Sequence, residues 1–366
     1  MCTNIKIKTV NNEWITGRTN EFFGYFKSDL VFLPRGYEYP KFFNRPDLGT
    51  EKLSYAMIGE TAKTAEIMEI DMDANSFIDG INEFGLSVST LYFSIGFEWK
   101  VVEESDLKPE YISGYVLTNW LLGQCKTTKE VRAWMTKNYD RVVILKTEKE
   151  VQGFHFAVVD ATGDSIVIEP ENGRLYVKEN FSGVMTNSPR LEWHQENLAN
   201  FINLTPIDTI SNSKIIDKNG KPIIKRTMSN GLKNLPGDWQ STSRYIRAHY
   251  LSLNASKPKT IEEGINTTFR ILHTSDIVAG TIITPVPDEF MKFEPLVKTD
   301  LEGSFIADIT DCILVKDLTN KIYYYKDIHN ISPRFVKLTD YLDETEVKRI
   351  DFGDDKSLKF QEVKLI

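Results

Sequence analysis

A cysteine at position 2 could carry catalysis without a histidine beside it. The sequence begins MCTN, and a side chain as small as that of Cys2 permits removal of the initiator methionine, leaving a thiol and a free α-amino group on one residue. An α-amino group has an ordinary pKa of about 7.7 to 8.0, so it can take the thiol proton near neutral pH. Nucleophile and base would then coincide in Cys2. The position alone does not establish this chemistry, because many proteins carry a cysteine there by chance.

The other residue types that commonly carry chemistry show no recognisable spacing. Cys2, Cys125 and Cys312 are widely separated and odd in number, so they form neither a disulfide framework nor a zinc-binding pair, and at least one thiol is free. The five histidines form no HExxH motif and no close pair, so a metal site is not expected. The motifs GxGxxG, GxxxxGK[ST] and GxSxG are missing as well, which argues against dinucleotide enzymes, P-loop nucleotide hydrolases and serine hydrolases.

Composition indicates a globular protein with no affinity for nucleic acid. With 366 residues and 41% hydrophobic content, the chain can bury a large core. Its 52 acidic and 44 basic residues give a net charge of -8, and no Lys/Arg-rich block is present to neutralise phosphates. No apolar run reaches the roughly 18 to 20 residues of a membrane span, and the N-terminus lacks the basic start and apolar core of a signal peptide. We therefore expect a cytoplasmic protein with no membrane partner.

Strand patterns dominate both ends of the chain and its middle. The segments NIKIKTV, EWITGRT and DLVFLPRG open the sequence, and DCILVKD and NKIYYYKD lie near its end. These segments predict antiparallel hairpins. The middle run HFAVVDATGDSIVIEPENGRLYVKEN predicts a meander of three strands, in which Asn172 and Gly173 form a type I′ turn at positive φ.

Helices are interleaved with these strands. The clearest begins at Thr127, where T-x-x-E with Glu130 is typical of a capping box, and Val131 and Met135 lie on one face that should be core. Further candidates are LTNWLLGQC, TSRYIRAHYLSLN and IEEGINTTFRILHTS. The polar stretch at about 205–225 looks like an excursion from the core rather than a domain linker. Antiparallel strand groups with inserted helices predict an α+β fold built in layers.

Five blocks, taken in order, make the chain similar to a known family. The first, MCTNIKIKTVNNEWITGRTNEF, has a Cys at the head of one strand and an Arg in the next. The others are DGINEFGLSVSTLYF, GVMTNSPRLEWH, LPGDWQSTSRYIRA and NKIYYYK, at residues 79–93, 183–194, 235–248 and 320–326. Together they resemble the choloylglycine hydrolase family of bile salt hydrolases and penicillin V acylases over nearly the whole chain. The resemblance implies one domain over residues 1–366, with the four-layer αββα sandwich of two antiparallel sheets found in N-terminal nucleophile hydrolases.

The resemblance also implies the residues of the site. Cys2 matches the nucleophile of the family. Arg18 matches an arginine whose charge favours the thiolate, although without the resemblance a strand-end arginine paired with a carboxylate is the simpler interpretation. Asn187 matches an amide whose N–H donates to the developing oxyanion, and would otherwise be a turn residue before Ser-Pro. Arg244 matches a further arginine of the site, and would otherwise be a solvated charge on a helix.

Two positions depart from the family pattern. Glu21 stands where the family has an Asp that binds the α-amino group of the nucleophile, so we expect Glu21 to hold that group from a slightly more distant backbone, or else to mark altered activity. Tyr92 stands where bile salt hydrolases carry Asn and some penicillin V acylases carry Tyr, and its backbone N–H is the second oxyanion donor that the resemblance implies. An aromatic side chain here favours a phenoxyacetyl or acyl-chain substrate over a hydroxylated steroid, unless it only fills the core.

The resemblance implies that Cys2 hydrolyses a linear amide through a thioester, with no metal or organic cofactor. Penicillin V or a related N-acyl amide is the expected substrate, and conjugated bile salts and N-acyl homoserine lactones are the alternatives, because pocket shape decides among them. A homologue that binds acyl amides without turning them over is the alternative of another class. Family members often form homotetramers through an extension at the place of the excursion 205–225, so we expect a homo-oligomer, either a tetramer or a dimer.

Overall fold

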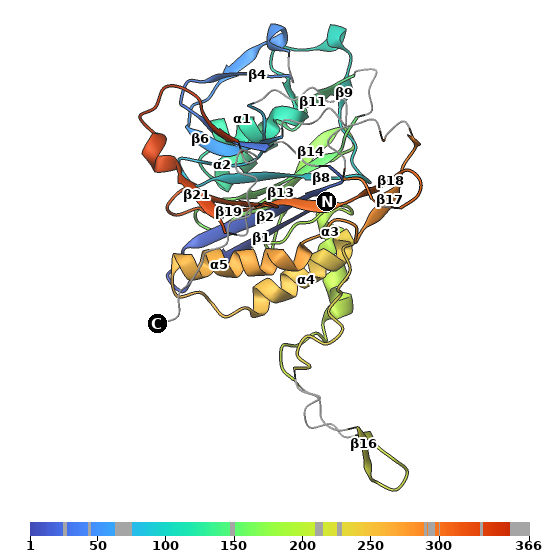
Figure 1. Ribbon diagram of the computed structural model, residues 1–366. Helices are drawn as coiled ribbons and strands as arrows, with labels where there is room; N and C mark the ends of the chain where they lie inside the picture. Colours follow the sequence, from blue (N-terminus) through green and yellow to red (C-terminus); the bar gives the residue numbers. More distant parts are fainter. Residues whose placement is uncertain are drawn as a thin grey trace.

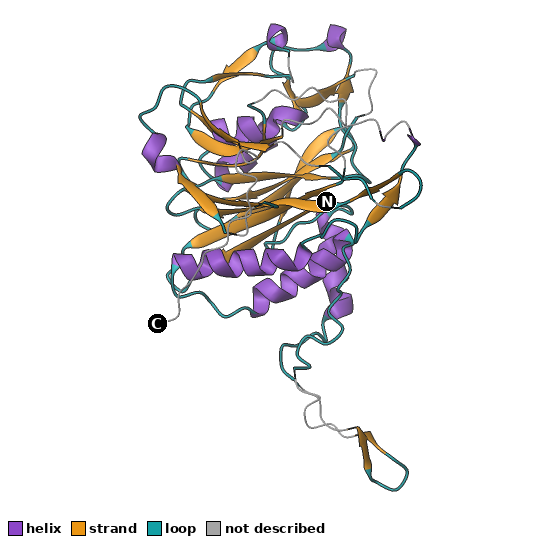
Figure 2. Cartoon of the chain, viewed as in Figure 1, coloured by secondary structure: helices purple, strands orange, loops and turns teal. Residues whose placement is uncertain are grey.

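Two antiparallel sheets lie face to face in the computed structural model, and helices cover the outer face of each sheet (Figure 1, Figure 2). The structure describes residues 1–24, 28–42, 45–62, 75–146, 151–208, 215–224, 229–288, 291, 297–299, 301–329 and 332–351.

The first sheet joins the two ends of the chain. Its five strands are, in spatial order, β1 (Cys2–Lys8), β2 (Trp14–Phe22), β19 (Ile309–Asp317), β20 (Ile322–Asp327) and β21 (Arg334–Lys337). The predicted opening hairpin is present, with Cys2 opposite Asn20 across β1 and β2. Strand β19 pairs with the other edge of β2 and places Cys312 opposite the same Asn20. The head of the chain therefore lies two strands away from a segment more than three hundred residues later.

The second sheet contains the predicted meander. Its eight strands are, in spatial order, β14 (Arg174–Glu179), β13 (Ser165–Glu171), β12 (Phe154–Val159), β8 (Ser87–Tyr92), β7 (Phe77–Asn82), β6 (Met57–Ala62), β3 (Ser28–Leu33) and β22 (Lys348–Asp351). Between β13 and β14, Asn172 and Gly173 have φ of 50° and 70°. Positive φ at both central residues is the requirement of a type I′ turn, as the sequence predicts.

The helices complete the four layers. Helices α1 (Leu117–Gln124) and α2 (Thr128–Asn138) contact the eight-stranded sheet, and α4 (Ser241–Asn254) and α5 (Ile261–Leu272) contact β1, β2 and β19 of the five-stranded sheet. Figure 1 shows these pairs of helices on opposite sides of the two sheets. A shorter helix, α3 (Leu191–Asn197), follows β14. The predicted αββα sandwich is thereby confirmed.

Local sequence signals determine where the helices begin. The hydroxyl of Thr127 accepts from the N–H of Glu130 at 3.3 Å, so α2 begins at the predicted cap, and Val131 and Met135 face the core. The Glu130 carboxylate accepts from the N–H of the residue before Thr127, at 2.7 Å, and thus binds one residue earlier than a capping box requires. Helix α5 begins in the same way, at Thr260. Satisfying these otherwise unpaired N–H groups stabilises each helix by about 1 kcal/mol.

The layer between the sheets holds apolar and charged side chains side by side. Leu30, Ile58 and Leu314 belong to one buried cluster there, and each side chain of this kind contributes roughly 1.5–3 kcal/mol through burial. Elsewhere in the layer, Lys316 donates to both carboxylate oxygens of Asp79 at 2.7 and 2.5 Å, and both side chains are fully buried. Buried charges are tolerated only when paired, so these charged side chains depend on their contacts being complete.

The described residues of the predicted excursion, 205–208 and 215–224, form an arm. Its described part includes a small hairpin of β15 (Ile215–Ile216) and β16 (Pro222–Ile224), whose turn is held by the carboxylate of Asp217 accepting two backbone N–H groups. Figure 1 shows this hairpin far from both sheets, beyond the end of α4. The hairpin therefore lies apart from the layers that contain Cys2.

The remaining elements are short. They are β4 (Glu38–Pro40), β5 (Thr50–Lys52), β9 (Val101–Val102), β10 (Ile112–Ser113), β11 (Val142–Leu145), β17 (Ile283–Pro285), β18 (Phe305–Ala307), and the 3-10 helices at Pro46–Leu48, Glu104–Asp106, Gly114–Val116, Leu198–Phe201, His273–Ser275 and Leu338–Tyr341. Within the described ranges, no helix has both the length and the apolar character that crossing a bilayer requires.

Candidate active site

The thiol of Cys2 lies beside a guanidinium between the two sheets. Cys2 begins β1 and is buried, and Nη2 of Arg18 donates to its Sγ at 3.3 Å. Arg18 is in turn held by the carbonyl of Ile78 at 2.8 Å, with Glu60 at 4.0 Å. Burial opposes the charge of Arg18, but the negative charges of Cys2, Glu60 and Asp79 raise its pKa above the ordinary value. A permanent positive charge so close to the sulfur stabilises a thiolate.

Asn187 binds the main chain of Cys2 from the segment between β14 and α3. Its Oδ1 accepts from the backbone N–H of Cys2 at 2.8 Å and from Nη2 of Arg244 at 2.7 Å. Its Nδ2 donates to the carbonyl of Tyr92 at 2.7 Å. With the acceptor oxygen occupied by two donors, the amide nitrogen must face β8, so the orientation of the Asn187 side chain is determined.

Arg244 joins α4 to the head of β1. Its Nη1 donates to the carbonyl of Cys2 and, at 2.7 Å, to the hydroxyl of Thr3, while Nε donates to the carbonyl of Trp239 at 2.9 Å. The side chain is fully buried. Burial lowers the pKa of Arg244 in spite of the nearby negative charges of Glu21 and Cys2. Sequence patterns alone would place Arg244 in solvent on the helix surface. Arg244 is instead buried and binds the main chain of Cys2.

Tyr92 presents its backbone to Asn187 and its ring to solvent. In an extended strand the N–H and C=O of one residue point to the same side. Because the carbonyl of Tyr92 accepts from Asn187, its N–H points to the Asn187 side of β8. The side chain is 40% exposed and meets the ring of Phe154 edge to face at 6.3 Å. Tyr92 is thus an exposed aromatic at the end of a strand, and it does not fill the core.

Glu21 lies near the chain terminus without binding Cys2. It is buried in β2, and its backbone carbonyl accepts from the amino group of Met1. Among the described residues, its carboxylate makes no hydrogen bond to Met1 or Cys2. Burial raises the pKa of the Glu21 carboxyl, against the opposing charges of Arg244 and the chain terminus. The structure therefore brings together Cys2, Arg18, Asn187, Arg244 and the Tyr92 backbone, with Glu21 adjacent.

Comparison with known proteins gives the same assignment over nearly the whole chain. Residues 2–349 match the profile of the linear amide C-N hydrolases, choloylglycine hydrolase family. The chain is 27% identical over 355 residues to a bile salt hydrolase/transferase from Clostridium perfringens, covering 96% of this chain and 97% of that one. It is also 27% identical over 354 residues to a bile salt hydrolase/transferase from Lactiplantibacillus plantarum, covering 95% of each. The chain belongs to the choloylglycine hydrolase family. It is therefore a hydrolase of carbon–nitrogen bonds in linear amides.

Solved structures of choloylglycine hydrolase relatives have the same fold. The C2A mutant of conjugated bile acid hydrolase from Clostridium perfringens superposes with a TM-score of 0.77 at 24% identity, covering all of both chains. Penicillin V acylase from Agrobacterium tumefaciens gives a TM-score of 0.69 at 19% identity, covering 96% of this chain and 92% of that one. Both similarities confirm the predicted sandwich.

Sequence reasoning missed the buried groups that hold the candidate residues in place. Glu60, Asp79 and Lys316 lie behind Arg18, and His155 and His194 lie behind Asn187. Two of them carried a signal, because Asp79 opens the block at 79–93 and His194 closes the block at 183–194. Nothing in the sequence pairs Lys316 with a carboxylate 237 positions away.

The other two cysteines lack the surroundings of a nucleophile. Burial raises the pKa of Cys125 to about 12, and burial together with Glu60 raises that of Cys312 well above the usual range. A thiol that stays protonated is a poor nucleophile. Cys312 is nevertheless closer to the site than its place in the sequence suggests, since its Sγ donates to Glu60 at 3.2 Å.

Proposed function

We propose that Cys2, once Met1 is removed, is the nucleophile of this amide hydrolase. The observation that supports the proposal most strongly is the convergence on one residue of a guanidinium at 3.3 Å from Sγ and of Asn187 at 2.8 Å from the backbone nitrogen. The names of two solved relatives, the C2A and R18L variants of the Clostridium perfringens conjugated bile acid hydrolase, indicate that cysteine and arginine occur at these positions there. Arg18 would stabilise the thiolate, and Arg244 would position both Cys2 and Asn187.

The proposed reaction needs only groups of the protein and water. Sγ of Cys2 attacks the amide carbonyl carbon, and the α-amino group accepts the thiol proton. The oxyanion receives hydrogen bonds from Nδ2 of Asn187 and the backbone N–H of Tyr92, which lie on the same side of β8. The C–N bond breaks as the ammonium returns the proton to the leaving amine. Water then attacks the thioester, releases the carboxylic acid and regenerates the thiol.

Removal of Met1 would free the base without disturbing its contacts. The backbone nitrogen of Cys2 already donates to Asn187 Oδ1, and a free amino group could keep that bond while its lone pair accepts the thiol proton. The carbonyl of Glu21, which now accepts from the Met1 amino group, would become available as well. Glu21 is proposed to act through its charge on the α-amino group, because its carboxylate makes no direct bond to Cys2.

Replacing Cys2 tests the proposal directly. Intact mass should show that the active protein has lost one methionine, and Cys2→Ala should reduce turnover to background while the thermal unfolding temperature changes little. Cys125→Ala is the matched control, since this buried cysteine contacts none of the proposed residues, and it should retain turnover. Full activity of a protein that keeps Met1 would contradict the α-amino base.

For the substrate we propose an N-acyl amide with an aromatic or acyl-chain group, of the penicillin V type. The exposed ring of Tyr92 beside Phe154 supports this choice, because it offers an apolar aromatic surface next to the proposed oxyanion donors. Conjugated bile salts are the second candidate, supported by the names of the relatives that match nearly the whole chain. A panel of penicillin V, taurine- and glycine-conjugated bile salts and N-acyl homoserine lactones, compared by kcat/KM, decides between them.

We also propose that residues 1–366 form one domain and that the arm around 205–225 mediates homo-oligomerisation. Two apolar side chains are strongly exposed here, Ile207 in the arm and Ile202 just before it, and apolar groups of this kind are commonly covered by a partner. Light scattering coupled to size exclusion should give a mass that is a multiple of the chain. Ile207→Asp should reduce that mass, and a mass of one chain for the wild type would contradict the proposal.

A further inference from the structure

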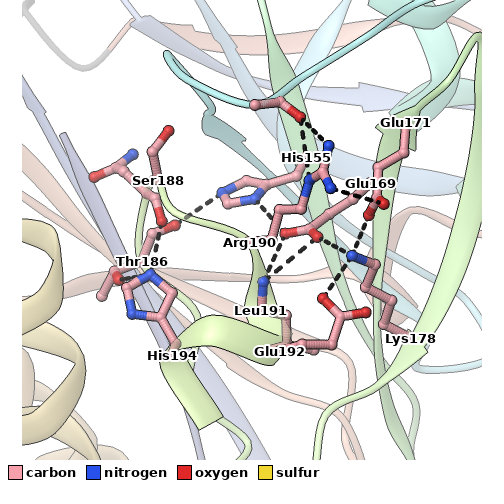
Figure 3. A network of polar contacts seen from close by, with 12 residues as sticks. His155, Glu169, Glu171, Lys178, Thr186, Ser188, Arg190, Leu191, Glu192 and His194 are labelled. Carbon is pink, nitrogen blue, oxygen red and sulfur yellow. Dashed lines mark hydrogen bonds and ion pairs between the residues drawn. The ribbon is translucent and has the colours of Figure 1, made fainter. Parts of the chain in front are cut away.

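A buried charged network lies directly behind Asn187. His155 on β12 and Glu169 on β13 are fully buried, and Figure 3 shows the histidine ring between Glu169 and Thr186. Nδ1 of His155 lies 3.1 Å from Oε1 of Glu169, and Nε2 lies 2.9 Å from the carbonyl oxygen of Thr186. The ring stacks on Phe93 with centroids 4.7 Å apart. Thr186 immediately precedes Asn187, so the histidine holds the segment that carries the proposed oxyanion donor.

Glu169 is an ionised acceptor in this network. Its Oε1 accepts from the N–H of Leu191 at 3.1 Å, and its Oε2 lies 2.7 Å from Nζ of Lys178 (Figure 3). Burial alone would raise the pKa of the Glu169 carboxyl, but hydrogen bonding and charge pairing with His155 and Lys178 lower it below the usual value. An ionised carboxylate only accepts hydrogen bonds.

Both ring nitrogens of His155 therefore face acceptors that cannot donate. A neutral imidazole carries hydrogen on one nitrogen only, and would leave either Glu169 or the carbonyl of Thr186 against a lone pair. An imidazolium donates to both. An unmatched buried acceptor costs roughly 1–3 kcal/mol, so these two contacts favour the cationic form of His155.

A second histidine holds the next carbonyl in the opposite charge state. Nε2 of His194 lies 2.9 Å from the carbonyl oxygen of Asn187, and within the described part of the chain its Nδ1 has no hydrogen-bond partner. Burial lowers the pKa of His194 to about 4, so this ring is neutral and donates from Nε2. Two consecutive carbonyls, at positions 186 and 187, are thus each held by a buried histidine, one whose contacts favour the cation and one that is neutral.

The other charges around the network balance it. Lys178 Nζ also pairs with Glu171 and, at 2.6 Å, with Glu192, while Arg190 lies 3.3 Å from Glu171. The carboxylates of Glu169, Glu171 and Glu192 approach one another as metal ligands would, but the ammonium of Lys178 already pairs with all three. The cluster is therefore an ion-pair network that anchors Glu169.

We propose that His155 is a positioning residue that works as a buried imidazolium: bound to Glu169, it fixes the carbonyl of Thr186 and, through it, the side chain of Asn187 against Cys2 and Tyr92. The inference rests on the proposed role of Asn187 in hydrolysis. It assigns to the enzyme a titratable group that touches neither the nucleophile nor the substrate. When the imidazolium loses its proton, one of its two bonds is lost and the Asn187 segment loses a fixed point.

The charge state is tested without turnover. In the Cys2→Ala protein labelled with 15N-histidine, the ring nitrogens of His155 should show the nearly equal shifts of an imidazolium at pH 7, whereas those of His194 should show the split pattern of a neutral ring. A neutral ring at His155 would overturn the proposal and leave the assignment of Cys2 as nucleophile intact. If the proposed function itself were wrong, the Cys2→Ala variant would still hydrolyse the substrate.

The positioning role is tested by His155→Gln and Glu169→Gln. His155→Gln should lower kcat by about 10- to 100-fold, because a displacement of about 1 Å at a catalytic group has effects of that order, while KM changes less than about threefold. The decline of kcat on the alkaline side should move to lower pH in Glu169→Gln, since the imidazolium loses its anion, and should vanish in His155→Gln. His249→Gln, a half-buried histidine on α4 away from the network, is the control and should match the wild type.

An unchanged kcat in a folded His155→Gln protein would overturn the positioning role. If that variant does not fold, two measurements still test the proposal. They are the pH at which kcat declines in Glu169→Gln and the 15N chemical shifts of the His155 ring. An alkaline decline at the same pH in the wild type and Glu169→Gln would contradict the inference.

Discussion

The two sides of Cys2 are held by different kinds of contact. On the sulfur side, Arg18 stands between Sγ and the buried carboxylates of Glu60 and Asp79, within the charged layer between the sheets. On the main-chain side, Asn187 and Arg244 bind the N–H and the carbonyl of Cys2 from a loop and from α4. The first set supplies charge, and the second supplies geometry. Changes to the first should therefore alter thiol reactivity, and changes to the second should alter the placement of donors around the substrate.

Replacing Asn187, on the main-chain side of Cys2, should lower activity more than replacing Arg18, on the sulfur side. Asn187→Ala deletes the proposed oxyanion donor and the acceptor that orders both the Cys2 nitrogen and Arg244, so kcat should fall about 10²–10³-fold. The rate of Cys2 alkylation should change much less, because Arg18 is untouched. Asn200→Ala, at an exposed position, is the control. Equal losses in kcat and alkylation rate would show that the two sides are not separable.

Removing the charge of Arg18 should give the opposite pattern. In Arg18→Gln the side chain keeps a donor but loses its charge, so iodoacetamide should alkylate Cys2 about tenfold more slowly at pH 7. Glu60 also loses its nearby cation, so thermal unfolding must be measured alongside. Arg45→Gln, which removes two exposed ion pairs, should leave alkylation unchanged. An unchanged alkylation rate in Arg18→Gln would contradict the proposal that the charge of Arg18 stabilises the thiolate of Cys2.

Glu21 sharpens the comparison because its proposed action is on the amino group rather than on the sulfur. A nearby carboxylate stabilises the ammonium form, so Glu21→Gln should lower the pKa of the α-amino group, shift the acidic limb of the pH–rate profile to lower pH and reduce the maximal rate several-fold. Glu21→Asp keeps the charge and should retain measurable activity. A Gln variant with the wild-type profile would show that Glu21 has only a structural role.

The same variant makes a prediction for stability. Burial raises the pKa of Glu21, so the contribution of this residue to folding is full below its unfolded value and is lost as the pH rises through its folded value. Glu21→Gln has no such loss. The unfolding temperature of the Gln variant minus that of the wild type should therefore increase between about pH 4 and pH 7, as measured by scanning calorimetry.

The smallest effects are expected at the two remaining cysteines. Cys125→Ala and Cys312→Ala should change kcat less than about twofold, since both thiols stay protonated and neither touches Cys2. Cys312→Ala should be the more perturbing of the two, because Glu60 loses one of its donors and keeps Asn20 and Ser28. A large loss of activity in Cys312→Ala alone would show that the contact of Cys312 with Glu60 also supports the site.

Local patterns predicted the elements, but they did not predict the contacts between them. The Asn172-Gly173 turn and the helix start at Thr127 depend on neighbouring residues, so periodicity and turn chemistry were sufficient. The four-layer αββα order and the group of residues around Cys2 were predicted from the family resemblance. The pairing of His155 with Glu169 and Thr186 joins residues from two strands and a loop, and no spacing rule specifies such a meeting.

Strand geometry could have predicted which face of the sheet Glu21 occupies, and the resemblance alone did not. Residues an odd number of positions apart on a strand point to opposite faces, and Arg18 and Glu21 are three apart on β2. Arg18 faces the layer between the sheets, so Glu21 belongs on the helix side, where Arg244 lies. The direct bond predicted from Glu21 to the amino group is not formed while Met1 is attached, and a carboxylate acting through its charge is consistent with that placement.

The contacts that hold Cys2 also bear on when Met1 can be removed during protein synthesis. Cys2 is bound by Asn187 and Arg244, and the strand beside it pairs with Ile309–Asp317. A ribosome adds about 5–20 residues per second, so on the order of ten seconds or longer pass before Asn187 and Arg244, which bind Cys2, have been added to the chain. During that interval an aminopeptidase can reach Met1, whereas in the folded chain its amino group is bound to Glu21 and partly buried. Maturation of the nucleophile would then be complete before the pocket that uses it exists.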